Sequence, residues 1–241
     1  MGDLRVELSA KRVRAYFGGE LVADTTAPRL VWEIPHYPQY YVPRSSVRAE
    51  LKPTDEAGVH DVVTRGGTAA GAARTFPDSE ELRDLVRFEF GAMDEWLEED
   101  EPIYVHPRDP YKRVDVLASS RHVRVALNGV TLAASSQPRI LFETSLPPRY
   151  YLPLSDVRFD LLRPSATRTQ CPYKGTADYW SVEVGGVLHE DLVWIYRSPL
   201  PESQKVAGMA CFYSEKVDLL VDGELQAKPE TPWSKLTDSE A

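Results

Sequence analysis

The chain has 241 residues, a formal net charge of -9 at pH 7 and a sequence pI near 5.1. It has no basic tract, which argues against nucleic acid as a partner, and its two cysteines are too few for a disulfide framework. The start lacks the apolar core of a signal peptide, and no apolar stretch reaches the length that spans a bilayer. We therefore expect a cytoplasmic protein without membrane contact, and two lone thiols fit a reducing compartment.

An internal repeat begins near the N-terminus. Residues 13–48 align without a gap with residues 123–158, at an offset of 110. Each copy starts with a predicted hairpin, whose turn is Gly18-Gly19 in the first copy and Asn128-Gly129 in the second. Both turns supply residues that accept positive φ, as tight hairpins require. A repeat of this length suits a small domain, so we expect two tandem domains.

The later segments also indicate mainly β structure. Residues 66–76 are rich in Gly and Ala and predict a loose loop, and residues 93–101 predict a short acidic helix. A second hairpin is expected over residues 179–196, a brief helix over 201–206 and a closing strand over 212–220. The prediction is a mainly-β chain with few short helices. Its expected parts are a first domain at 1–116, a second domain at 117–224 and a disordered tail at 225–241.

The second copy carries aromatic residues that the first copy lacks. Beyond residue 158 the alignment continues with shifts, which place Arg87 opposite Trp194 and Glu89 opposite Tyr196. Alternate residues of a strand point to opposite faces, so Val193 marks the core face and Trp194 and Tyr196 mark the other. Because unpaired charges are costly to bury, we expect this second face to be open in the first copy.

We therefore predict a ligand-binding site on that face of the second copy. Its residues are five aromatic side chains and a lysine: Tyr173, Lys174, Tyr179, Trp180, Trp194 and Tyr196. The alternative is that the face is buried against the other domain, and pockets often lie at such interfaces. Lys174 could bind an anion, act as an amine of depressed pKa or lie in solvent. Cys171 has no evident catalytic partner in the sequence, which favours a structural thiol.

His106 and Arg108 lie close to the expected boundary between the domains. They could contribute acid–base chemistry or anion contacts to the neighbouring site. An ordinary polar linker that docks two domains is the favoured interpretation.

Several motifs resemble a known bacterial family. They are the segments TQCPYKG at 169–175, YW at 179–180, DLVWIY at 191–196 and GMACFY at 208–213, and the segment at 104–117 resembles the linker of tandem members. The chain is similar to domain of unknown function 427, whose members are sometimes labelled nucleotidyltransferases. This resemblance implies two β-tent domains, related in shape to the Mss4-like group. Some β-tent relatives hold zinc, and some hold a small ligand in a tryptophan-lined cage.

The residues depart from the chemistry that such relatives use. Neither copy has a CxxC motif, so we expect no zinc site, no other metal and no cofactor. Nucleotidyltransfer needs paired carboxylates after a Gly-Gly turn. The nearest match, Gly66-Gly67 followed by Asp78 and Glu80, lacks the apolar residues of a strand. The first copy also lacks the CPYKG motif, which indicates a degenerate copy.

The leading hypothesis is that the second domain binds a small organic molecule in an aromatic, lysine-containing pocket. An enzyme of unknown reaction, which would use Lys174 with His106 and Arg108, is the first alternative, and a protein-interaction module is the second. If core side chains seal Trp194, both pocket hypotheses fail, whereas a flat aromatic patch would favour the interaction module. The ligand, any reaction and the oligomeric state stay open.

Overall fold

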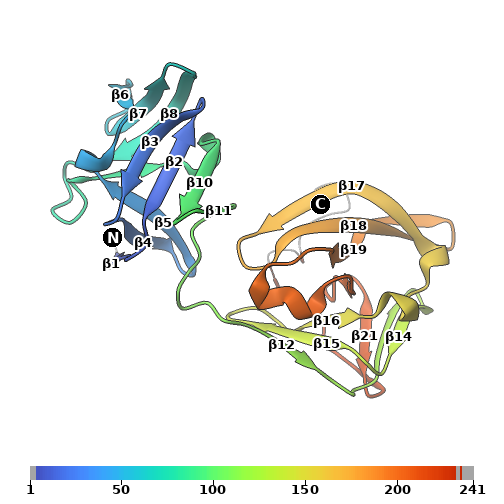
Figure 1. Ribbon diagram of the computed structural model, residues 1–241. Coiled ribbons are helices and arrows are strands. Elements are labelled where there is room, and N and C mark those ends of the chain that lie inside the picture. The colour runs from blue at the N-terminus through green and yellow to red at the C-terminus, as the bar shows by residue number, and fades with distance from the viewer. Residues whose placement is uncertain (1–3, 232–233, 235–241) are drawn as a thin grey trace. The chain divides into compact units, whose positions relative to one another are not determined.

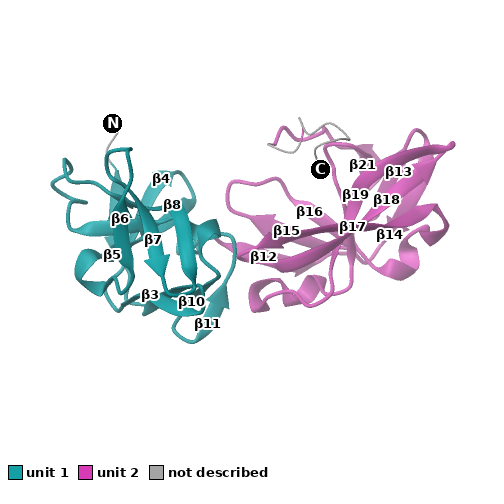
Figure 2. Cartoon of the chain, turned by 90° about the horizontal axis from the view of Figure 1, so that it is seen from above, with its two compact units in different colours: residues 1–111 teal, residues 112–241 magenta. Residues whose placement is uncertain are grey.

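The computed structural model describes residues 4–231 and residue 234. Strands dominate this part of the chain, which confirms the predicted mainly-β class with two tandem β domains. The chain divides into two compact units, residues 1–111 and residues 112–241 (Figures 1 and 2). Each unit combines a seven-stranded sheet with a four-stranded sheet.

The first unit is built as follows. Its larger sheet contains β1 (Arg5–Leu8), β4 (Arg29–Ile34), β5 (Tyr37–Pro43), β6 (Glu50–Pro53), β7 (Val59–Thr64), β8 (Gly67–Thr75) and β9 (Leu85–Phe88). Its smaller sheet contains β2 (Val13–Phe17), β3 (Glu20–Thr25), β10 (Glu95–Glu98) and β11 (Glu101–Ile103). The short 3-10 helices are η1 (Arg44–Ser46) and η2 (Phe90–Ala92). The strand orders are β1-β4-β5-β9-β8-β7-β6 and β11-β10-β2-β3.

The second unit repeats this plan. Its larger sheet contains β12 (Val114–Ala118), β15 (Arg139–Glu143), β16 (Arg149–Leu152), β17 (Leu162–Cys171), β18 (Gly175–Val184), β19 (Val187–Tyr196) and β20 (Ala210–Phe212). Its smaller sheet contains β13 (Val123–Leu127), β14 (Val130–Ser135), β21 (Asp218–Val221) and β22 (Glu224–Leu225). The 3-10 helices are η3 (Leu154–Asp156), η4 (Phe159–Leu161) and η5 (Pro201–Val206). The orders are β12-β15-β16-β20-β19-β18-β17 and β14-β13-β21-β22.

The hairpins that open each copy are confirmed. Asn128 and Gly129 have φ of 50° and 80° at the turn between β13 and β14. Gly18 and Gly19 have φ of 60° and 75° at the turn between β2 and β3. The apolar side chains of β2 and β13 are buried in the main core of their own unit. Burial of one valine or leucine stabilises a fold by about 1.5–3 kcal/mol, so these residues anchor the smaller sheet in each unit.

The sheet orders show which strands of the two units correspond. Counted from β1 and from β12, β9 takes the place of β20, and β8 takes the place of β19. The pairing of residues within the sheets gives the same correspondence. One residue each of β5, β9 and β8 lie side by side across the first sheet, and one residue each of β16, β20 and β19 lie side by side in the same way across the second. The counterparts in this row are Tyr41 for Tyr151, Arg87 for Cys211 and Arg74 for Trp194.

The alignment of Trp194 with Arg87, and of Tyr196 with Glu89, is therefore wrong. The error arose because the hairpins that precede these strands differ in length: β17 has 10 residues, whereas β6 has 4. Similar Leu-Val pairs occur on β9 and β19 because both strands are buried, although the two strands do not correspond. The first copy still carries charged side chains on the face that corresponds to that of Trp194, because Arg74 and Arg87 lie on it.

Two local predictions are also wrong. Residues 67–75 form strand β8 instead of a loose loop, because β7 and β9 flank them and supply hydrogen-bond partners that composition does not reveal. Residues 95–98 form strand β10 instead of an acidic helix, and Trp96 on this strand is buried. The expected closing strand at 212–220 is divided between β20 and β21. The brief helix at 201–206 is present as η5.

The chain passes from the first unit to the second between Tyr111 and Lys112, and the expected boundary after residue 116 falls inside β12. Part of the tail expected to be disordered has structure. β22 ends at Leu225, and the Thr231 hydroxyl donates to Glu215 Oε1 at 2.7 Å. Residues 232–233 and 235–241 of that tail lie outside the described residues.

Candidate functional site

The two faces of β18 and β19 carry different side chains, as strand parity predicts. Val193 and Ile195 belong to the main core of the second unit. Trp194 and Tyr196 lie on the other face and belong to a separate buried cluster. In Figure 1 the large sheet of this unit curves, so that β17, β18 and β19 lie opposite β12, β15 and β16, with the orange helix η5 between them. The parity prediction is therefore confirmed, and the second face is enclosed within its own unit.

We call the buried residues of this second face the aromatic cluster. It comprises Val116, Leu141, Tyr151, Ala177, Tyr179, Trp194, Tyr196, Val206 and Cys211. All of these residues belong to the second unit, and Trp194 is only 7% exposed. The aromatic side chains thus pack as a second core, and they do not form an exposed patch.

Hydrogen bonds position the rings of the aromatic cluster. The indole Nε1 of Trp194 donates to the Tyr151 hydroxyl at 3.1 Å, and the two rings meet nearly at right angles, at 87°. The Tyr179 hydroxyl lies 2.9 Å from the Thr169 hydroxyl. Burial raises the pKa of Tyr151 and of Tyr196, so both hydroxyls are neutral at physiological pH.

Three charged side chains meet beside the aromatic cluster, and we call them the ion triad. Glu143, the last residue of β15, has a side chain only 4% exposed. Lys112 Nζ lies 2.9 Å from Glu143 Oε1, and Lys174 Nζ donates to Glu143 Oε2. Lys174 lies in the turn between β17 and β18, and its side chain is 14% exposed. Two ammonium groups therefore share a single carboxylate.

These contacts fix the charge of the ion triad. Burial alone would raise the pKa of Glu143, but Lys174 and Lys112 together lower it below its ordinary value. Burial alone would lower the pKa of Lys174, but Cys171 and Glu143 together raise it. The hypothesis of an amine with depressed pKa is therefore wrong, because Glu143 holds Lys174 as an ammonium ion.

Two more polar groups lie beside the ion triad. Cys171 ends β17 three residues before Lys174, and its carbonyl oxygen accepts the Lys174 backbone N–H at 3.3 Å. Tyr196 belongs to the aromatic cluster, and burial is the main cause that raises the pKa of its hydroxyl. Within the described part of the chain this hydroxyl makes no hydrogen bond, and it is not among the fully enclosed polar atoms. Tyr196 thus offers a neutral donor to anything that reaches the ion triad.

The other predicted site residues fall in three places. Tyr173 is buried next to the ion triad, with Lys112 Nζ 5.2 Å from its ring centre. Trp180 packs on the opposite face, against the main core, and Arg197 lies over its ring. This separation follows from parity, because Tyr179 and Trp180 are neighbours on one strand and cannot share a face.

His106 and Arg108 belong to the first unit, which is described by itself. The His106 ring lies against Tyr37, with 3.6 Å between the ring centres, and its Nδ1 is 2.7 Å from the Pro107 carbonyl oxygen. Both contacts lie within the first unit, and any role of His106 and Arg108 at the predicted site stays a prediction. The structure thus brings five predicted residues together in the second unit: Tyr173, Lys174, Tyr179, Trp194 and Tyr196.

Sequence reasoning missed Glu143 and Lys112 as site residues. The signal for Glu143 was present, because the repeat keeps a glutamate at this position as Glu33. In the first unit Glu33 accepts a hydrogen bond from the Tyr41 hydroxyl at 2.6 Å and pairs with Arg87 Nη1 at 2.8 Å. The first unit thus neutralises the carboxylate that both copies keep with an arginine on β9, which is separated from β4 by β5, and the second unit has Cys211 at the position of this arginine.

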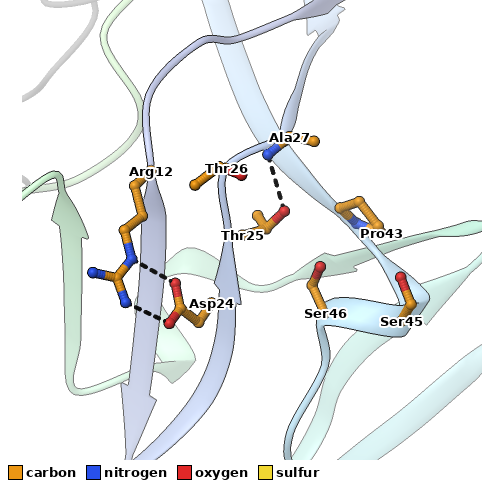
Figure 3. Close-up of a pocket in the computed structure, with 8 residues that line it drawn as sticks. All are labelled: Arg12, Asp24, Thr25, Thr26, Ala27, Pro43, Ser45 and Ser46. Atoms are coloured by element: carbon orange, nitrogen blue, oxygen red, sulfur yellow. Dashed lines mark hydrogen bonds and ion pairs between the residues drawn. The ribbon is translucent and has the colours of Figure 1, made fainter.

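A polar hollow of about 490 Å³ lies in the first unit. Its lining is Arg12, Asp24, Thr25, Thr26, Ala27, Pro43, Ser45 and Ser46 (Figure 3). Arg12 and Asp24 bind each other through two parallel hydrogen bonds of 2.8 and 2.6 Å, and the Thr25 hydroxyl accepts from the Ala27 N–H. Because its charged groups already neutralise each other, this hollow is the weaker candidate.

The residues that the structure describes contain no group of three His, Cys, Asp or Glu side chains placed to hold a metal ion. No helix in this same part of the chain has the length and apolar character needed to cross a membrane.

Comparison with known families gives one result. The family described as domain of unknown function (DUF427) matches residues 5–99 and residues 115–223. The two matched segments lie in different compact units. A search of curated proteins finds no match for the chain.

Proposed function

Because the chain belongs to the DUF427 family, with one copy of the domain in each unit, we propose that its second unit binds a small organic anion beside the aromatic cluster. The observation that carries the proposal is the ion triad, in which Lys112 and Lys174 share the carboxylate of Glu143.

The ion triad carries a net charge of +1, because two ammonium groups share one carboxylate. The side chains of Lys112 and Lys174 are 15% and 14% exposed, so water hydrates each ammonium group only in part. An incompletely hydrated cation attracts an anion strongly at short range, because the surrounding dielectric is low. A ligand with a negative group would complete the neutralisation of this centre.

The neighbouring groups favour a carboxylate on an apolar body. Tyr196 has a neutral hydroxyl and Lys174 has a charged ammonium, and each group can donate a hydrogen bond to a carboxylate. Tyr173 and the rings of the aromatic cluster offer an apolar wall beside them. Binding sites for small molecules commonly combine such a wall with a few convergent polar groups.

The alternatives have less support. An interaction module would present its aromatic residues on the surface, whereas Tyr179, Trp194 and Tyr196 are buried. An enzyme that used Lys174 as a nucleophile would need a neutral amine, whereas its pKa is raised. The burial of Trp194 among core side chains counts as failure of the predicted aromatic pocket around the indole. The ligand of the present proposal would instead lie at the ion triad and Tyr196.

The test is a thermal shift titration with benzoate and with benzamide, its uncharged counterpart, at constant ionic strength. We expect benzoate to raise the Tm and benzamide to have no comparable effect. Lys174→Gln should abolish the benzoate shift, because it removes the excess charge. Lys205→Gln is the matched control, since Lys205 is an exposed lysine of the same unit whose Nζ donates to the Val116 carbonyl oxygen. Equal shifts with both compounds, or a benzoate shift that survives Lys174→Gln, would contradict the proposal.

A further inference from the structure

The polar hollow of the first unit lies where the edge of β3 separates from a later segment of the chain. Ala23 of β3 pairs with Val47 in an isolated antiparallel bridge. Past this bridge, β3 continues through residues 24 and 25, whereas residues 44–46 turn away from it as the 3-10 helix η1. The hollow of about 490 Å³ is therefore bordered by the end of β3 on one side and by η1 on the other (Figure 3).

Hydroxyl groups without protein partners line this hollow. Within the part of the chain that the structure describes, the side-chain hydroxyls of Thr26, Ser45 and Ser46 make no hydrogen bond. Thr26 and Ser45 are exposed, and Ser46 is half-buried. Each hydroxyl can donate one hydrogen bond and accept others. All three are therefore able to bond to a ligand without giving up a contact within the protein.

The ion pair of Arg12 and Asp24 is fixed in place but keeps unused bonding capacity. Arg12 Nε and Nη2 donate to the two oxygens of Asp24 at 2.8 and 2.6 Å, and the Arg12 backbone N–H donates to Glu99 Oε1 at 2.8 Å. Among the described residues, Arg12 Nη1 has no hydrogen-bond partner, and each Asp24 oxygen accepts a single bond, although a carboxylate oxygen can accept two. The pair thus offers both donors and acceptors.

The second unit lacks this combination of groups. At the offset of 110, Ala134 takes the place of Asp24, and Asp156 takes the place of Ser46. The hydroxyl of Ser155, the counterpart of Ser45, already donates to Asp156 Oδ1 at 3.0 Å. The neutral ion pair with unpartnered hydroxyls around it is therefore a property of the first unit.

We propose that this hollow binds a neutral ligand rich in hydroxyl groups, such as the ring of a sugar or a cyclitol. Among the residues that line the hollow, Arg12 and Asp24 alone are charged, so an ion that one of them attracts is repelled by the other. This balance makes the hollow a weak site for an ion but suits a neutral ligand. A sugar hydroxyl both donates and accepts, which matches the mixed groups of the lining. The proposal does not rest on the anion site of the second unit.

The probes are methyl α-D-glucopyranoside, its galacto and manno isomers and myo-inositol, each added to the full chain at up to tens of millimolar. Amide proton–nitrogen NMR spectra report binding residue by residue. For at least one of these polyols we expect saturable shifts within residues 24–27 and 43–46. Tetrahydropyran, the sugar ring without hydroxyl groups, should give none.

Two substitutions in the lining test which groups bind the polyol. Asp24→Ala should weaken binding by about tenfold, because hydrogen bonds to a charged group are lost, and Ser46→Ala should weaken it by about fivefold. Ser136→Ala is the matched control and should bind as the wild type does. Ser136 is an exposed serine of the second unit whose hydroxyl has no partner among the described residues.

The proposal is overturned if none of the four polyols gives saturable shifts at these residues, or if tetrahydropyran gives equal ones. Wild-type affinity in a folded Asp24→Ala or Ser46→Ala protein would overturn it too. The dispersion of the same spectra shows whether each variant is folded. Ser46→Ala removes a hydroxyl that has no described partner, so it keeps the test decisive if Asp24→Ala does not fold. The benzoate titration has no bearing on any of these outcomes.

Discussion

Glu33 and Glu143 are identical positions of the repeat, yet different partners neutralise them. Glu33 pairs with Arg87 and also accepts from Tyr41, whereas Glu143 is held between two lysines. Glu143 is buried and must have a cation close by, whereas Glu33 is exposed, so this requirement applies to the second unit alone. One lysine is enough to neutralise Glu143. The second lysine leaves a net positive charge, which a purely structural ion pair would not have.

The ion triad makes stability depend on pH. Glu143→Gln should lower the free energy of unfolding by about 3 kcal/mol near neutral pH, because it leaves two poorly hydrated ammonium groups without a carboxylate. The folded-state pKa of Glu143 lies below its ordinary value of 4.5, so this stabilisation is present above 4.5 and disappears as the pH falls through the folded-state pKa. Urea unfolding of both proteins at several pH values should show the difference narrowing in acid. A difference that stays constant from neutral pH into acid would be inconsistent with an ionised Glu143.

At the scale of elements, both long hairpins contain the same β-bulge. The register shifts after His60 in β7 and after Trp180 in β18. Opposite each register shift, the partner strand has a residue with positive φ: Gly71, at 61°, and Asp191, at 48°. The backbone N–H of each donates across the bulge, Gly71 to Asp61 Oδ1 at 2.8 Å and Asp191 to Ser181 Oγ at 3.2 Å. The bulge thus requires a left-handed backbone at this position in both units.

Substitution at Gly71 tests this requirement. A Cβ at Gly71 would meet only Val59 Cγ1, at 3.7 Å, so any cost comes from the backbone and not from a clash. Gly71→Ala should destabilise the first unit by about 1 kcal/mol, and Gly71→Asn should cost less, since Asn tolerates positive φ better than Ala. Chemical denaturation measures both. Equal stability of the glycine and alanine proteins would show that the bulge does not need this backbone.

Local sequence patterns predict some of these elements correctly and miss those that depend on distant segments. The turns at Asn128-Gly129 and Gly18-Gly19 and the two faces around Trp194 follow from local rules, and these predictions are confirmed. Strand β8 was missed because its hydrogen bonds come from distant segments. The burial of the aromatic cluster was missed for a related reason: only the curvature of the whole sheet brings β12 and β15 to the residues of β19.

At the scale of the whole molecule, the chain has a net charge of -9, but the two units distribute charge differently around the conserved glutamate. Near Glu33, the arginines Arg74 and Arg87 also face Glu56 and Glu89, so acidic groups outnumber basic ones. Near Glu143, the ion triad has two cations and one anion. An organic anion should therefore bind to the second copy of the domain and not to the first, although both copies have the same sheet topology.

Hydrogen exchange of the full chain with and without benzoate tests this difference most directly, because exchange is read separately in each unit. The anion-site proposal predicts slower exchange within residues 112–241, centred on the turn at 171–174 and the end of β15, with no change within residues 1–111. The protection should disappear in Lys174→Gln and persist in Lys205→Gln. Equal protection of both units, or protection of the second unit that does not depend on Lys174, would contradict the central claim that the excess charge of the ion triad binds the anion.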